Sequence, residues 1–341
     1  MSLRCTIAPR HVPADERGLV AVSVIGGAGD RPPAAAVGSE PLIEVAGLRM
    51  SYDGFEAVRG IDLRVSSGEI FTFLGPNGAG KTTTVEILEG HRTRTAGEVR
   101  VLGEDPERAD RWWRSRVGVV LQSSRVEPQL TVRECLELYA GYYPAPRSVQ
   151  EVIELVGLKK RSEVRCGNLS GGQQRRVDVA LALIGDPELV FLDEPTTGFD
   201  PSARRSAWEM IDGLRQLGTT VFLTTHYMDE AEALADRIAV LSAGVIVAEG
   251  TPSTLGGRDQ AAYQITFTLP PGVAIGDLPV ESGSARALDQ AAKVLIESER
   301  VMSTLQTLSS WAIEQRHEIS DLLVRRPALE DVYLGLTEPP K

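Results

Sequence analysis

A glycine-rich stretch between an apolar run and a helix-like segment constrains this chain more than any other feature. Residues 75–83 read Gly-Pro-Asn-Gly-Ala-Gly-Lys-Thr-Thr, after the apolar run 69–74 and before the helix-like segment 84–89. The pattern G-x-x-x-x-G-K-[ST], in the order strand, loop and helix, is typical of a phosphate-binding loop. The match is complete and has the right context, which disfavours a chance glycine-rich turn.

Each residue type in this loop suits phosphate binding. The glycines let successive backbone N–H groups point at an anion, and the start of the following helix adds its positive dipole end. Lys81 supplies a point charge for the β- and γ-phosphates, and the Thr82 hydroxyl is a candidate Mg²⁺ ligand. We predict that the whole loop binds nucleotide: Gly75, Pro76, Asn77, Gly78, Ala79, Gly80, Lys81, Thr82 and Thr83.

Polar residues also end three other predicted strands. Asp193 and Glu194 follow an apolar run, where Asp193 is predicted to hold Mg²⁺ and Glu194 to polarise a water for attack on the γ-phosphate. Two purely structural acids are the alternative. His226 follows residues 220–225 and is a candidate γ-phosphate sensor, although a lone histidine is usually structural. Gln122 follows residues 117–121, where its amide can reach a metal or water.

Two further features fit a nucleotide site. Ser170, Gly171, Gly172 and Gln173 precede a predicted helix at 175–184 and form a second anion-binding helix end, although alone they would be an ordinary cap and turn. Tyr52 offers a flat ring that can stack on a purine, the alternative being an ordinary strand-edge tyrosine.

Composition narrows the class of protein. The net charge of −11 argues against a broad nucleic-acid binder. The three cysteines, Cys5, Cys135 and Cys166, show no metal or disulfide spacing, which suits a reducing cytosol, and Cys166 is predicted to be a small buried hydrophobe. No apolar run reaches the roughly 18 residues of a membrane helix, so we expect any membrane role to come through a partner.

The chain divides into three parts. Residues 1–40 are rich in Ala, Gly, Pro and Arg and predict a disordered leader, unless translation begins later. Residues 41–256 hold all the motifs, with a helical insertion at about 123–186. Residues 257–341 predict a small α+β accessory domain with strands at 263–269, 294–297 and 319–324. Composition favours a dimerisation or stability role for this domain over ligand sensing.

Together, these motifs resemble the nucleotide-binding domain of ATP-binding cassette (ABC) proteins over about residues 41–256. The resemblance implies an α/β P-loop NTPase fold with a helical subdomain, and ATP and Mg²⁺ as cofactors. It implies that Tyr52 stacks on adenine and that Gln122 is the Q-loop glutamine, with a catalytic and metal-binding role. It makes Leu169–Gln173 the signature, Asp193 and Glu194 the Walker B aspartate and catalytic glutamate, and Asp200 and His226 the D-loop and switch residues.

More narrowly, the chain looks like the ATPase subunits of bacterial daunorubicin/doxorubicin-resistance-type drug exporters. Residues 171–180 and the tail 326–337 carry that likeness, although subunits that move lipids, polysaccharides or ions have similar sequences. Phe199 stands in the D-loop where leucine is usual, a change that we expect to be tolerated.

The resemblance also implies a mechanism and partners. Two chains would meet head to tail, so that each ATP lies between one glycine loop and the partner's signature, and a separate integral-membrane permease would receive the motion. The subunit would then sit at the cytoplasmic face of the membrane, without nucleic acid. A soluble ABC ATPase acting on ribosomes or DNA is the rival hypothesis, and an ordinary P-loop kinase leaves the signature unexplained.

Overall fold

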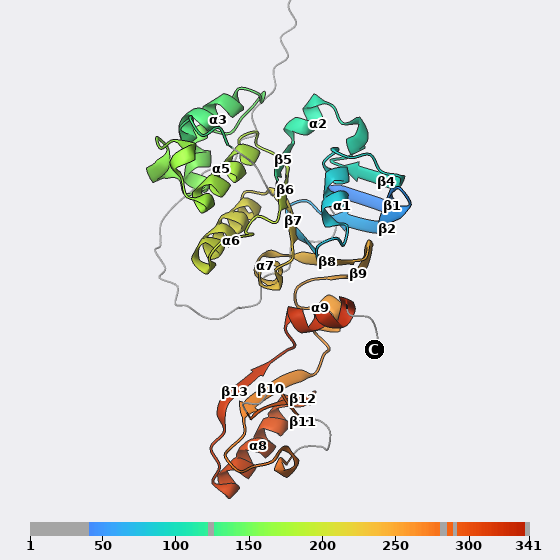
Figure 1. The fold of residues 1–341 in the computed structure, drawn as a ribbon, viewed down its shortest axis with the longest axis vertical. Helices are drawn as coiled ribbons and strands as arrows, with labels where there is room; N and C mark the ends of the chain where they lie inside the picture. The colour runs from blue at the N-terminus through green and yellow to red at the C-terminus, as the bar shows by residue number, and fades with distance from the viewer. Residues whose placement is uncertain (1–40, 122–125, 280–284, 289–291, 338–341) are drawn as a thin grey trace, which may run out of the picture. The chain divides into compact units, whose positions relative to one another are not determined.

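The computed structural model describes residues 41–121, 126–279, 285–288 and 292–337 (Figure 1). The predicted leader, residues 1–40, and the candidate Gln122 lie outside the described residues. The described part of the chain contains three β-sheets, two in the region of the motifs and one in the C-terminal region.

The first sheet is antiparallel, with the strand order β2-β1-β4. Its strands alternate buried and exposed residues, because only one face of the sheet meets the core. Tyr52 ends β1 and faces Phe55 across a tight hairpin, so it belongs to the strand and not to the connection between two strands. The strands are β1 (Ile43–Tyr52), β2 (Phe55–Val65) and β4 (Ala96–Val101).

The second sheet leads into the glycine loop, Asp193 and His226, and has the order β5-β6-β7-β3-β8-β9. All neighbours are parallel except β8 and β9, which form an antiparallel hairpin. Strands β3 and β7 are buried along their whole length, as expected for parallel strands covered on both faces. The strands are β3 (Ile70–Leu74), β5 (Val117–Val120), β6 (Leu189–Asp193), β7 (Thr220–Thr225), β8 (Arg237–Ser242) and β9 (Val245–Gly250).

Outside the helical insertion, four α-helices and one 3₁₀ helix of the described residues connect the strands of these sheets. Helix α6 begins at Pro201 because the Asp200 carboxylate accepts the backbone N–H groups of Ser202 and Ala203. Residues 106–115 form a short 3₁₀ turn followed by a short α-helix. The side chain of Trp113 is buried, whereas that of Trp112 is exposed. The helices are α1 (Lys81–Leu88), η1 (Pro106–Arg108), α2 (Arg111–Ser115), α6 (Pro201–Gln216) and α7 (Met228–Leu234).

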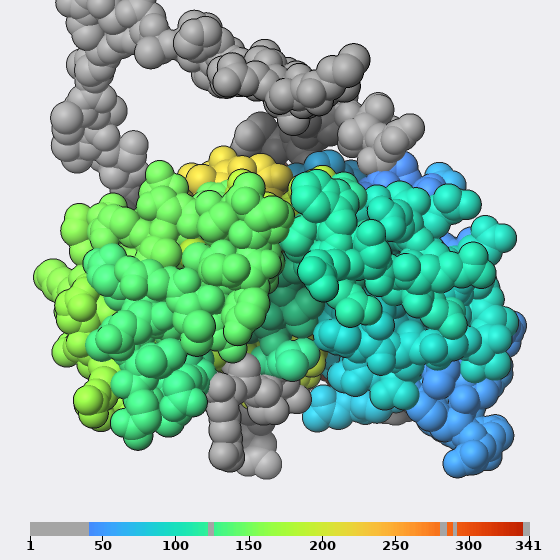
Figure 2. Space-filling model, turned by 90° about the horizontal axis from the view of Figure 1, so that it is seen from above, coloured from blue at the N-terminus to red at the C-terminus, as the bar shows by residue number. Residues whose placement is uncertain are grey.

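The predicted helical insertion is present and forms the green surface in Figure 2, beside the teal surface of residues near α2. Prolines 144 and 146 separate its first two long helices. Cys135 and Cys166 are both buried in its core, which confirms the packing role predicted for Cys166. The elements are α3 (Val132–Ala140), α4 (Val149–Leu155), η2 (Lys159–Arg161), η3 (Cys166–Asn168) and α5 (Gly171–Leu183).

The C-terminal region contains an antiparallel sheet with the order β11-β12-β10-β13. Helix α8 packs on it through Leu308, against Ile265, Phe267 and Ile296 of the sheet. Three of its strands match the predicted segments, whereas β11 was not predicted. The elements are η4 (Leu255–Gly257), β10 (Tyr263–Thr268), η5 (Ile275–Asp277), β11 (Ala285–Ala287), β12 (Lys293–Ser298), α8 (Val301–Gln315), β13 (Ser320–Arg325) and α9 (Leu329–Thr337).

Helix α9 returns to the motif-bearing region after β13. Leu329 and Tyr333 are buried in a cluster with Leu74 of β3 and Ala231 of α7. The preceding segment is held by Arg258, which donates to the Pro327 carbonyl and pairs with Glu232 of α7. Helix α9 is therefore part of the core beneath the glycine loop.

Candidate active site

The glycine loop joins the buried end of β3 to α1. Gly78 and Gly80 have φ values of 81° and 104°, in the region that favours glycine. A Cβ atom at Gly80 would collide with the Ala57 carbonyl oxygen. Helix α1 has no side-chain cap at Gly80, so its first N–H groups are available to an anion.

Four predicted residues converge beside this loop. The Lys81 ammonium donates to the carbonyl oxygens of Gly75 and Pro76 at 2.7 and 3.2 Å, and lies 3.7 Å from Glu194 Oε1. His226 Nδ1 lies 3.2 Å from the same carboxylate oxygen. Burial lowers the pKa of Lys81, and the charges of Glu194 and Asp193 partly offset this effect. The amine, two acids and imidazole therefore form one cluster.

Threonine side chains that were not predicted as functional complete this cluster. Thr224 Oγ1 donates to Asp193 Oδ1 and also accepts the Glu194 backbone N–H at 3.1 Å. Thr197 Oγ1 donates to Glu194 Oε2 at 3.2 Å. Both threonines fix the carboxylates that the sequence had singled out. The signal for Thr224 was its place in the strand just before His226.

Tyr52 and the end of the loop also come together. The Tyr52 hydroxyl lies 3.4 Å from Thr83 Oγ1, and the Arg92 guanidinium lies over the ring at 5.2 Å from its centroid. Thr82 is exposed at the start of α1. The tyrosine ring is thus placed beside the loop, where an adenine that stacks on it would use the face away from Arg92.

The signature residues lie elsewhere in this chain. Ser170 and Gln173 form a capping box at the start of α5, so this helix begins at Gly171 and not at Arg175 as predicted. With Gly172, Phe199 and Asp200 they line a separate cavity of about 400 Å³. Within the described part of the chain, no hydrogen bond or ion pair joins residues 170–173 to the glycine loop. The glycine-loop cluster and the signature residues therefore lie in two separate places on one chain.

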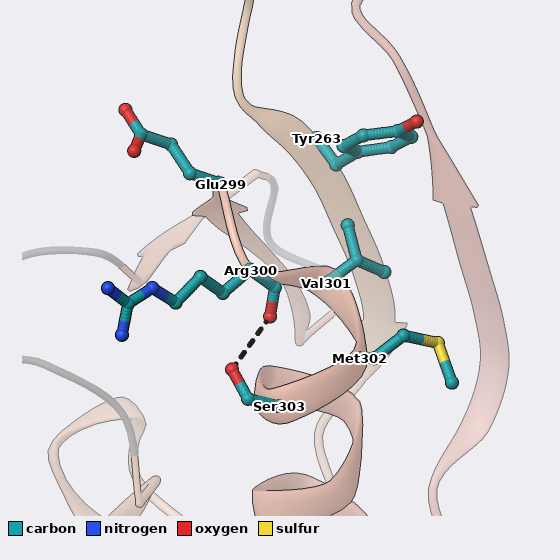
Figure 3. A pocket seen from close by; sticks show the side chains of 6 residues that line it. All are labelled: Tyr263, Glu299, Arg300, Val301, Met302 and Ser303. Atoms are coloured by element: carbon teal, nitrogen blue, oxygen red, sulfur yellow. Dashed lines mark hydrogen bonds between the residues drawn. The ribbon is translucent and has the colours of Figure 1, made fainter.

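A second cavity, of about 640 Å³, lies in the C-terminal region. Figure 3 shows Tyr263, Val301 and Met302 on one side, with the side chains of Glu299 and Arg300 directed to the other. Ser303 Oγ donates to the Arg300 carbonyl at 3.0 Å, so it is engaged within its own helix turn. The lining of this cavity is largely apolar.

Comparison with known proteins decides the family. A family model described as ABC transporter matches residues 58–197, and an ABC transporter domain-containing protein-like C-terminal domain matches residues 263–328. Several relatives are named Nod factor export ATP-binding protein I. The one from Paraburkholderia xenovorans is 38% identical over 87% of this chain and 97% of its own length. The one from Rhizobium meliloti is 42% identical over 95% of this chain and 93% of its own length. The chain belongs to the ATP-binding subunits of ABC transporters.

Other comparisons agree with this ABC membership. The daunorubicin resistance ATP-binding protein DrrA3 of Streptomyces coeruleorubidus is 36% identical over 88% of this chain and 96% of its own length. A dimeric ATP-binding cassette in a post-hydrolysis state, bound to ADP and Pi, is 26% identical. The match covers 61% of this chain and 98% of the chain of that cassette, with a TM-score of 0.55. The predicted fold and resemblance are confirmed, and the subunit is an ATPase coupled to transport.

The oxygen ligands at this ABC site fit Mg²⁺. Thr82 supplies an exposed hydroxyl and Asp193 a carboxylate, which are the ligand types that this hard cation prefers. Within the described residues, no group of three or more His, Cys, Asp or Glu side chains could enclose a metal. That is compatible with Mg²⁺, which usually keeps several waters and binds through one or two protein ligands together with substrate phosphates.

Proposed function

We propose that this chain is the ATP-hydrolysing subunit of a bacterial ABC exporter that works as a homodimer. One observation carries the proposal: Lys81, Asp193, Glu194 and His226 cluster beside the glycine loop, whereas the signature residues line a different cavity. Two copies arranged head to tail would join each glycine loop to the other copy's signature. ATP would favour this closed pair, because only there does its γ-phosphate meet both halves.

The chemistry assigned to each residue follows from its place. Backbone N–H groups of the loop and Lys81 bind the phosphates, and the side chain of Tyr52 stacks on adenine. Glu194 polarises the attacking water, and His226 stands beside it to contact the γ-phosphate. Mg²⁺, held by Thr82, Asp193 and Gln122, would neutralise charge on the phosphates. Ser170 and the following glycines contact the ATP of the other copy.

The partner is proposed to be a separate integral-membrane permease. No helix of the described residues has the length and apolarity needed to cross a bilayer. The helical insertion and the region after Gln122 are the proposed docking region, at the cytoplasmic face of the membrane. The names of the relatives favour export over a role on ribosomes or DNA. A drug or another hydrophobic compound is the proposed cargo.

Replacing the catalytic carboxylate tests this proposal. Glu194→Gln is expected to keep ATP binding, to lower hydrolysis by about 100-fold or more and to accumulate an ATP-bound dimer. The measurements are an ATP titration, the steady-state ATPase rate and the mass in solution with and without ATP. Lys81→Ala is the control: it should lose nucleotide affinity and remain a monomer. Wild-type hydrolysis by Glu194→Gln would contradict the role of this residue.

A further inference from the structure

Arg175, in the second turn of helix α5, contacts the ends of two strands of the catalytic sheet. Its Nη2 donates to the Asp193 carbonyl at 2.9 Å, its Nε donates to the Pro195 carbonyl at 3.3 Å, and its Nη1 donates to the Leu121 carbonyl. Asp193 and Pro195 stand on either side of Glu194. Leu121 follows β5 and directly precedes Gln122.

The environment of Arg175 shows that these contacts are specific. Its side chain is 12% exposed, and Asp178, one helical turn later, is the nearby acid at 3.9 Å. Burial lowers the pKa of Arg175, and the charges of Asp178 and Asp193 act in the opposite direction. A guanidinium presents five N–H donors in a rigid planar fork, so it can serve three carbonyls from different segments at once.

The backbone that Arg175 contacts is strained. Glu194 has a φ of 44°, in the left-handed region that a residue with a side chain rarely adopts. The peptide group between Asp193 and Glu194 is held at both ends: its N–H donates to the Thr224 carbonyl at 3.1 Å, and its C=O accepts from Arg175. Such a conformation persists only where the surroundings fix it.

We propose that Arg175 is a positioning residue that holds the backbone around Glu194 in the geometry required for hydrolysis. This inference rests on the proposed role of Glu194. Arg175 lies on helix α5, whose N-cap is Ser170 of the signature. It therefore also connects the signature, which contacts the other copy's ATP, to Glu194, which acts on the chain's own ATP. A tilt of α5 on signature engagement would therefore be transmitted to Glu194 through these carbonyl contacts.

Arg175→Gln tests this inference. We expect kcat for ATP hydrolysis to fall by about 10- to 100-fold, since a small misplacement of a catalytic group has this effect, with KM and ATP affinity within about twofold of wild type. Arg175→Lys keeps the charge but not the fork, so it should recover part of the rate. In the Glu194→Gln background, Arg175→Gln should change the residual rate by less than about twofold, because the group through which it acts is already lost.

Arg258→Gln is the matched control. The Arg258 side chain is 13% exposed and also donates to backbone carbonyls, those of Pro327 and Pro252, at 2.6 and 2.8 Å, none of which belongs to the proposed site. Its replacement should lower the melting temperature about as much as Arg175→Gln does, but leave kcat within about twofold of wild type. Arg175→Lys supplies the test if Arg175→Gln does not fold.

Three outcomes would overturn the inference: equal loss of kcat in both arginine variants, a loss confined to ATP affinity, or an undiminished effect in the Glu194→Gln background. Full activity of Glu194→Gln would instead contradict the proposed function. The two failures are therefore distinguishable.

Discussion

Single residues near the nucleotide site show how burial changes a carboxyl group. Glu89 ends helix α1, and its side chain is only 2% exposed. Burial raises the pKa of Glu89 to about 8, and the charges of Asp193 and Glu86 act in the same direction. His91 Nδ1 lies 3.2 Å from its carboxyl group. The folded protein therefore retains a proton on Glu89 at pH values where the unfolded chain has lost it.

This proton predicts a pH dependence of stability. Between about pH 4.5 and pH 8 the folded state binds more protons at Glu89 than the unfolded state does. The contribution of this group to the free energy of unfolding therefore falls as pH rises, and it levels off above about pH 8. Glu89→Gln should remove this dependence and stabilise the nucleotide-free protein at pH 8 by on the order of a few kcal/mol. Urea unfolding at several pH values, with EDTA present, measures it.

The control for this prediction is Glu209→Gln, at an exposed position of α6. Its stability should follow the pH profile of the wild type. A profile of Glu89→Gln that keeps the wild-type slope between pH 5 and pH 8 would contradict the proposed proton on Glu89.

At the scale of elements, the last helix is an integral part of the core. Leu329 of α9 is fully buried with Leu74, which precedes the glycine loop, and with Ala231 of α7, the helix after His226. Gly256 lies so close to Val332 that a Cβ atom there would collide with its side chain. Helix α9 therefore packs against the strand that precedes the glycine loop and against the helix that follows His226.

Shortening this buried side chain should destabilise the protein. Leu329→Ala is expected to lower the free energy of unfolding by about 2–5 kcal/mol, through lost burial and the cavity left behind. Leu334→Ala, at a position of the same helix that is 45% exposed, should change it by less than about 0.5 kcal/mol. Urea unfolding compares the two variants. Equal effects would show that α9 does not pack as described.

At the scale of the whole molecule, the separation of the glycine-loop cluster from the signature residues predicts cooperation between two copies of the chain. The ATPase rate per chain should rise with protein concentration and reach a plateau once the ATP-bound dimer predominates. Dilution series with saturating ATP, combined with sedimentation, measure the rate and the oligomeric state together. A strictly monomeric sample with a constant rate per chain would contradict the shared site.

The sequence by itself determined the cassette and the places of its motifs on strands and helices. The glycine loop, Asp193, Glu194, His226 and the signature have spacings that only a few backbone geometries satisfy, so their strand-end and helix-start positions followed from the pattern. The strands of the parallel sheet were also predictable, because burial on both faces leaves continuous apolar runs.

Only the tertiary structure decided which residues support these groups. Arg175 and Thr224 reach Asp193 and Glu194 from other elements, through contacts formed across 18 and 31 residues. The place of Thr224 just before His226 indicates that it lies near the site, but it does not indicate which residues Thr224 contacts. The docking of α9 beneath the glycine loop was likewise not predicted, since a short apolar tail does not indicate its partner. Local spacing constrains local backbone, whereas packing between distant segments depends on the whole fold.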